Sequence, residues 1–351
     1  MNTIVVYPSS GPAPLLDQDH YEALDTAVRR VLATDLAFET YAQIIDGLPT
    51  FEVARDRCGP ILDRRHPIRL HTQLCSEALR IARIMIDTVD IRHFSFQTSL
   101  LRSFQGGTLW SRRFQLRLLE LVAVALHQLA VCLFQKDYLP LHDRFGAPCQ
   151  SSDGVSDGAS DVQAVTSWTP PPLKSSSAPA KAPLPTLFAH PAFIAHEQYP
   201  NGVGDMVGYW AEDRILGGVS LFDRSQLWKN GDEEPNIYFQ SSRPQKTWWI
   251  WQLTDGQQKE LIRLVCPEFN HSPENKESDA QDPICPLPIS FRQCRERRRV
   301  VDPEYAVVIN KIYRDAWERP PPRSPNGFIR GYDLLVERKP TTGCCKDFVA
   351  R

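Results

Sequence analysis

The residues best suited to catalysis lie close together, between positions 190 and 224. This stretch gathers imidazole and carboxyl side chains, which are common general acids and bases in enzymes. The candidates are His190, His196, Asp205, Glu212 and Asp213. If two of them met at an apolar hollow, an enzyme without a cofactor would have its acid and its base.

The same side chains also bind transition metals, but their spacing is not that of a metal motif. His190 and His196 are separated by five residues, and the chain contains neither an HExxH motif nor a CxxC pair. Zinc sites usually draw on closely spaced ligands. The P-loop and the dinucleotide fingerprint are also absent from the sequence. We therefore expect no metal site and no cofactor, and hydrogen-bonded histidines are the plainer interpretation.

Two predicted strands would position these groups. Residues 206–211 and 215–222 flank Glu212-Asp213, which suggests a β-hairpin. With a two-residue turn, Gly208 would face Gly217 and leave a shallow hollow beside Trp210. This hollow is a candidate ligand-binding surface. The alternative is a twisted hairpin in which the glycines serve packing alone.

Tryptophans in a second stretch could extend this surface. Trp249 and Trp251 would share one face of a strand over residues 247–253, and Trp248 would point to the other face. Aromatic side chains can line a pocket for a flat or apolar ligand. They can equally cover a small sheet, and the sequence leaves both possibilities open.

The surrounding pattern predicts an α+β protein, with an N-terminal α-helical bundle followed by a small antiparallel sheet and flanking helices. In the first half, apolar residues recur at helical spacing, as in His71–Val89. In the second half we expect strands at 237–241 and 247–253, a helix after Thr254, and a last helix opened by Asp302-Pro303. The predicted regions are a helical part (1–145), a disordered Ser/Pro-rich linker (146–186), an α+β part with the hairpin (187–335) and a flexible tail (336–351).

The most apolar segment, Leu116–Phe134, includes Arg117, Glu120, His127 and Gln128. A membrane-spanning helix tolerates few such groups, so we predict a buried core helix and no membrane partner. The formal net charge of -2 gives no general attraction to nucleic acid, and none is expected as a partner.

Nine cysteines at irregular spacing, with no secretory signal before them, indicate reduced thiols and a cytoplasmic protein. A nuclear location stays open because Arg295–Arg299 could act as an import signal. A solvated segment that pairs with nearby acids is the plainer interpretation of that run.

Several stretches of the second half resemble an uncharacterised protein family of filamentous ascomycete fungi. They are Gly208–Arg214 (GYWAEDR), followed by Gly217-Gly218-Val and Leu221–Arg224; Tyr238–Pro244; Cys285–Pro288; and Arg298–Pro303 with Ile312–Arg319. The resemblance brings no established activity. It implies an accessory role, and such families sometimes occur beside secondary-metabolite genes.

Two functions follow as hypotheses. The first is a non-catalytic or accessory fungal protein that binds a protein partner or a small metabolite at Gly208, Trp210 and Gly217. The second is a cofactor-independent cyclase, isomerase or hydrolase that acts on a small apolar metabolite. The enzyme requires that two of the acid–base candidates converge on a concave pocket.

Overall fold

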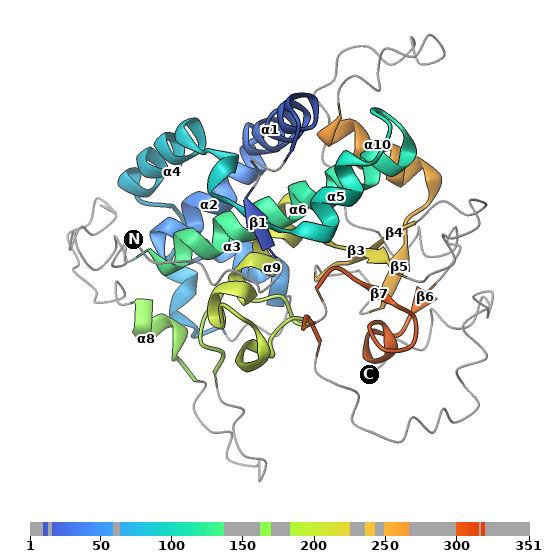
Figure 1. Ribbon diagram of the computed structural model, residues 1–351. Helices are drawn as coiled ribbons and strands as arrows, with labels where there is room; N and C mark the ends of the chain where they lie inside the picture. The colour runs from blue at the N-terminus through green and yellow to red at the C-terminus, as the bar shows by residue number, and fades with distance from the viewer. Residues whose placement is uncertain are drawn as a thin grey trace, which may run out of the picture.

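The computed structural model describes residues 10–12, 16–58, 64–136, 162–169, 183–224, 236–242, 249–266, 300–315 and 317–319. It confirms an α+β fold with an N-terminal helical region and a small antiparallel sheet (Figure 1). The α-helices are α1 (Gln18–Leu32), α2 (Asp35–Asp46), α3 (Phe51–Cys58), α4 (Ser76–Thr88), α5 (Thr98–Gln105), α6 (Arg112–Gln135), α8 (Val162–Thr166), α9 (Val203–Leu216) and α10 (Asp255–Val265). The 3-10 turns are η3 (Pro67–Leu70), η4 (Ile91–His93), η5 (His196–Gln198) and η10 (Pro303–Tyr305). The strands are β1 (Ser10–Pro12), β2 (Ser95–Gln97), β3 (Val219–Asp223), β4 (Ile237–Gln240), β5 (Ile250–Gln252), β6 (Val300–Val301) and β7 (Ile312–Tyr313).

Side-chain caps fix where several helices begin. Thr34 caps α2, Ser111 caps α6, and Thr254, after which a helix is predicted, forms a capping box with Gln257. Asp17 caps α1 by accepting a hydrogen bond from the His20 amide. The local sequence thus sets the helix starts to within a few residues.

Helix α6 runs through the centre of the protein and is buried on nearly all sides. Among the described helices it alone is long and apolar enough to cross a membrane, and 89% of its most apolar window is buried inside the protein. The prediction of a buried core helix is confirmed. The apolar composition of α6 follows from this position, with α1, α2, α5, α9 and α10 packed around it.

The predicted hairpin is wrong, since residues 203–216 form helix α9 and β3 follows directly. From Gly204 onward only Arg214 in this helix is not buried. A helix buried on every side has no polar stripe, so its apolar and aromatic residues resemble those of a strand. Gly217 ends the helix in the left-handed conformation, with φ of 89°.

The main sheet has five antiparallel strands in the order β6-β5-β4-β3-β7. Strand β3 pairs with β4 in the register Val219↔Gln240 to Phe222↔Ile237. Successive residues point to opposite faces, so on β4 Ile237 and Phe239 join the large core, while Tyr238 joins a second core on the other face. Both faces are covered, which explains why the described residues of β4 are all buried.

The last described segment holds the sheet at both edges. We call residues 300–315 and 317–319 the C-terminal strap. Its β6 pairs with β5 at one edge, and its β7 pairs with β3 at the other. The predicted helix after Asp302 is wrong beyond its first turn. Asp302 caps only the 3-10 turn η10, and the chain then forms strand β7, in which Ile312 pairs with Asp223 of β3.

The two halves of the chain share one hydrophobic core. Leu24 of α1 and Leu126 of α6 belong to the same cluster as Phe239 of β4 and Leu261 of α10. The predicted disordered linker is ordered in part, because Val165 of α8 is 2% exposed and packs with residues of α3 and η3. The rest of that linker, apart from residues 183–186, and the predicted tail lie outside the described residues.

Candidate functional site

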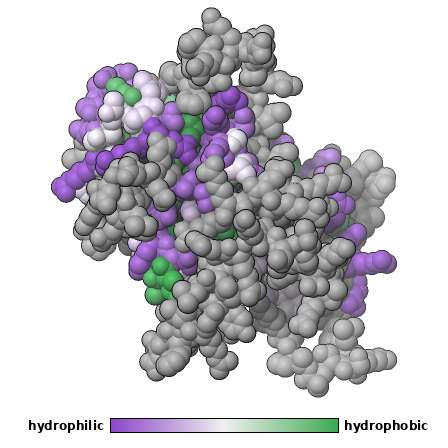
Figure 2. Space-filling view, turned by 90° about the vertical axis from the view of Figure 1, so that its right-hand side faces the viewer, coloured by the Kyte–Doolittle hydropathy of each residue, from purple (hydrophilic) through white to green (hydrophobic). Residues whose placement is uncertain are grey.

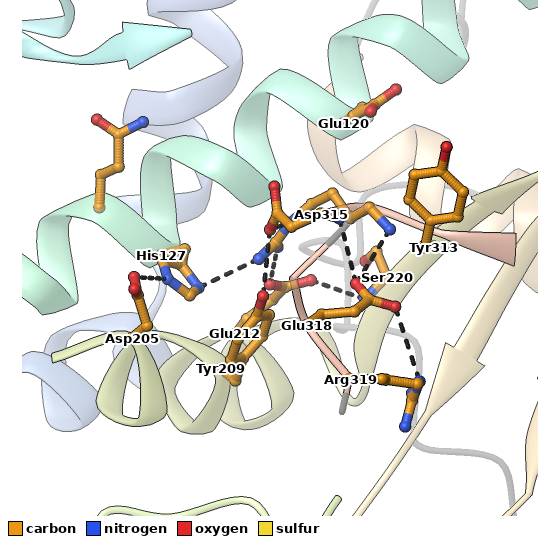
Figure 3. Close-up of polar contacts among 12 residues, drawn as sticks. Glu120, His127, Asp205, Tyr209, Glu212, Ser220, Tyr313, Asp315, Glu318 and Arg319 are labelled. Carbon is orange, nitrogen blue, oxygen red and sulfur yellow. Dashed lines mark hydrogen bonds and ion pairs between the residues drawn. The ribbon is translucent and has the colours of Figure 1, made fainter. Parts of the chain in front are cut away.

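Arg314 of the C-terminal strap lies at the centre of a buried charged cluster. Its guanidinium donates to Glu212 and, from Nε, to Asp315 at 2.9 Å. The guanidinium carbon also lies 5.2 Å from the centre of the Tyr209 ring. Arg314 is 3% exposed and Glu212 is fully buried, so the ion pair is removed from water. We call Arg314 with its surrounding ionisable groups the Arg314 cluster (Figure 3).

His127 of α6 connects Arg314 to Asp205 of α9. Its Nδ1 lies 3.2 Å from the Arg314 guanidinium, and its Nε2 lies 2.9 Å from Asp205 Oδ1. A guanidinium only donates, so Nδ1 accepts and Nε2 carries the proton that is donated to Asp205. Both ring nitrogens are therefore occupied. Burial acts to raise the pKa of Asp205, but the hydrogen bonds from His127 and Asn201 outweigh it and lower that pKa.

Glu212 joins the cluster to the sheet. Its Oε1 accepts a 2.7 Å hydrogen bond from the Ser220 amide of β3, while Oε2 accepts from Arg314. Burial raises the pKa of Glu212, and the attraction of Arg314 opposes this shift only in part. Each oxygen of this carboxylate thus has a partner, which favours a structural role for Glu212.

The cluster extends to Glu318 at one end and to Glu120 at the other. Glu318 Oε2 accepts hydrogen bonds from the Arg314 and Asp315 amides, and its Oε1 lies 3.8 Å from Arg319 Nε. Burial raises the pKa of Glu318 to about 7, although the charge of Arg319 acts to lower it. At the other end, Arg224 donates both to Glu120 and to the Arg314 carbonyl.

Among the ion pairs that the described residues form, the cluster holds one more acid than base. With His127 neutral, the carboxylates outnumber the arginines by one; the set is Arg117, Arg224, Arg314 and Arg319 with Glu120, Asp205, Glu212, Asp315 and Glu318. A buried excess charge is costly, and binding one proton removes it. The neighbouring cavity, lined in part by Glu120, Arg314 and Asp315, measures only about 20 Å³. That is room for about one water molecule.

Gly208 allows α9 to approach the His127 ring. A Cβ added at Gly208 would lie 2.6 Å from three atoms of that ring. We expect Gly208→Ala to destabilise the protein by roughly 1–3 kcal/mol, because His127 is held by hydrogen bonds and cannot move aside. Chemical denaturation measures the loss. The control is Gly256→Ala near the start of α10, where the nearest atom is 4.0 Å away and no loss is expected. Equal stability of Gly208→Ala and Gly256→Ala would contradict the close approach of α9 to the His127 ring.

Of the predicted catalytic candidates, the structure brings only Asp205 and Glu212 into one cluster. Asp213 instead accepts hydrogen bonds from the Ser242 amide and hydroxyl, the latter at 2.6 Å. His190 is buried and its Nδ1 accepts from the Ala192 amide. His196 lies in η5, with its Nε2 3.4 Å from Glu197.

The predicted ligand-binding residues do not form one surface. Gly208 lies in the middle of α9, Gly217 ends that helix, and Trp210 is 2% exposed with its ring 4.7 Å from that of Phe188. Trp251 belongs to the large core and Trp249 packs against it, so they share a side of the sheet as expected. Trp248 and the Arg295–Arg299 run lie outside the described residues.

Sequence reasoning missed the main members of the cluster. His127 and Glu120 stand out as polar residues within an apolar helix, a signal that argued against a membrane span and equally marks a buried polar site. Arg314 and Glu318 lie in a stretch interpreted only as a resemblance. The sequence also contains Gly154-Val-Ser-Asp-Gly158, which matches the nucleophile-elbow pattern and lies outside the described residues.

A larger pocket lies apart from this cluster, among α1, α10 and the turn between α5 and α6. Its volume is about 350 Å³, within the range of small-molecule sites. Leu118, Val265 and Cys266 are buried residues of its lining. Asp19 and Glu22 of α1 and Trp110 are exposed residues of the same lining. We call this the Trp110 pocket.

Trp110 has an unusual backbone conformation for a large side chain. Its φ is 66°, in the left-handed region, and its side chain is 44% exposed. The Gln115 side chain donates to the Trp110 carbonyl at 3.1 Å, and the indole contacts Phe114 with ring centres 5.3 Å apart. Such strain costs about 1–3 kcal/mol and is found mainly at functional positions. Trp110 is thus a bulky, exposed residue where glycine would be less strained.

The fold and site define an α+β protein in which a helical bundle and a five-stranded sheet share one core, closed by a C-terminal strap. No family model matches the chain, and neither a curated protein nor a solved structure shows significant similarity to it.

Proposed function

We propose that this chain is a non-catalytic protein that binds a small metabolite in the Trp110 pocket. The observation that carries the proposal is a pocket of about 350 Å³ with a buried apolar lining and an exposed, strained tryptophan. Small-molecule sites typically combine apolar walls with a few polar groups, and here those groups are Asp19, Glu22 and Thr26.

A small molecule fits the described surface better than a protein partner does. The large exposed hydrophobic residues of the described part of the chain come from four separate segments; they are Leu70, Ile84, Trp110, Val308 and Ile309. On the face shown in Figure 2, the described surface is mostly polar, with small and separate hydrophobic patches. Stable protein interfaces instead need a contiguous buried centre.

The enzyme alternative has less support. It requires two of the candidates His190, His196, Asp205, Glu212 and Asp213 to meet at a ligand-sized pocket. None of the five lines the Trp110 pocket or the small cavity beside Arg314. Asp205 and Glu212 are instead held by His127, Arg314 and backbone amides. The accessory role in fungal secondary metabolism, which the resemblance implies, stays a prediction.

Trp110→Gly tests the proposal without damaging the fold. Glycine adopts a φ of 66° freely, so relief of strain offsets the lost contact with Phe114, and we expect the free energy of unfolding to change by less than about 1 kcal/mol. Native mass spectrometry of the full chain purified from its own cells should show a bound small molecule on the wild type and little or none on Trp110→Gly.

The matched control is Ile84→Ala on α4. Ile84 is 49% exposed and does not line the pocket, so its loss should leave ligand retention unchanged. A ligand that stays bound to Trp110→Gly as firmly as to the wild type would contradict this site.

A further inference from the structure

The Trp110 pocket has a consistent electrostatic character. Asp19 and Glu22 are three positions apart on α1 and therefore lie on the same face of that helix. None of the described lining residues is basic. Arg112, two residues from Trp110, is not part of the lining and donates to Gln258 of α10 instead. Within its described lining, the pocket thus presents two carboxylates and no basic side chain.

The last turn of α10 lies at the pocket, and one of its carbonyl groups, that of Leu264, already accepts a hydrogen bond from Arg30 of α1. Val265 is the last residue of the helix and Cys266 is its C-cap, and both line the pocket. The carbonyl groups at a helix C-terminus carry a partial negative charge, which favours a nearby cation. The N-terminus of α1, which has the opposite polarity, is already capped by Asp17.

Trp110 supplies the remaining element. An indole face attracts cations through its quadrupole and also stacks with flat apolar groups. Leu109, Leu118 and Val265 offer apolar surface in the same pocket. The site therefore joins a cation-attracting rim to an apolar interior.

From these features we infer that the ligand is a cationic amphiphile, a molecule with a protonated or quaternary amine joined to a flat apolar body. The amine lies between Trp110 and the carboxylates of Asp19 and Glu22, and the apolar body contacts Leu118 and Val265. This inference rests on the proposed function, since it names the ligand class of the same pocket.

Three probes with one indole body and different charge test it. Tryptamine is cationic, tryptophol is neutral and indole-3-acetate is anionic at neutral pH. Isothermal titration calorimetry on the full chain should give the order tryptamine, tryptophol, indole-3-acetate. We expect about a tenfold difference in affinity between the first two, in keeping with a partly exposed cation–π contact and nearby carboxylates.

The double variant Asp19→Asn/Glu22→Gln should bind tryptamine and tryptophol with equal affinity, while tryptophol binding stays at the wild-type level. If wild-type protein bound tryptophol or indole-3-acetate at least as tightly as tryptamine, the ligand class would be wrong and the binding function would stand. If none of the probes bound wild type more tightly than Trp110→Gly, both the class and the proposed function would be overturned.

Discussion

Replacement of Arg314 by methionine is expected to cost about 3–5 kcal/mol of stability, the usual loss when one partner of a buried ion pair is removed. Methionine keeps much of the volume but leaves the fully buried Glu212 without its cation. It also removes the donor to His127 Nδ1. Urea denaturation followed by circular dichroism measures the change in the free energy of unfolding.

A second variant separates the lost charge from the lost volume. Arg314→Met/Glu212→Gln removes the uncompensated carboxylate and should be more stable than Arg314→Met alone. Arg263→Met is the matched surface control: its partner Glu260 is exposed, and such pairs contribute about 1 kcal/mol or less. If Arg314→Met and Arg263→Met lost the same stability, Arg314 would not organise the core.

The protein should lose stability as the pH rises from about 5 to 8, and Glu318 should cause most of that loss. Its pKa in the folded protein is about 7, against an ordinary value of 4.5. Between these values the folded state binds more protons than the unfolded state, so a rise in pH favours unfolding. A difference of this size corresponds to about 3 kcal/mol, fully lost above pH 7. Glu212, whose pKa is also raised, acts in the same direction.

Glu318→Gln should flatten this dependence. Glutamine keeps an oxygen that can accept from the Arg314 and Asp315 amides, and it does not ionise. Unfolding free energies at pH 5, 6, 7 and 8 give the slope for each protein. Glu304→Gln, a change at an exposed position of the same strap, should keep the wild-type slope. An unaltered slope in Glu318→Gln would rule out Glu318 as the titrating group.

Much of the helical half could be predicted from the sequence because its signals are local. Caps such as Thr34 and Thr254 determine helix starts through hydrogen bonds to residues two or three positions away. On α1 the buried residues Leu24, Val28 and Val31 recur at helical spacing, and the opposite face is exposed. These elements need no tertiary information.

The failures have tertiary causes. Helix α9 contains Gly208, a poor helix former, where His127 of a distant segment fills the space. The strap forms β7 instead of a helix because strand β3, formed by residues 219–223, offers it an edge. Val308 and Ile309, which lie between η10 and β7, are exposed.

The candidate site was predictable only in part. Asp205 and Glu212 were identified by residue type. However, Glu212 pairs with Arg314, 102 residues further along the chain, and Asp205 pairs with His127, 78 residues before it. No spacing rule connects residues at such distances. Nothing in the sequence indicated the Trp110 pocket, because the value of φ at Trp110 and the contact of α1 with α10 are visible only in three dimensions.

The position of the strap in the sequence delays the completion of the core during synthesis. Arg314 leaves the ribosome 102 residues after Glu212, which corresponds to roughly 5 to 20 seconds of synthesis. During that interval Glu212 lacks the counter-charge of Arg314, and for most of it the sheet lacks its outer strands β6 and β7. Exposed strand edges attract other chains, so this is the period in which a chaperone would have most to protect. The native core can close only when the strap has emerged.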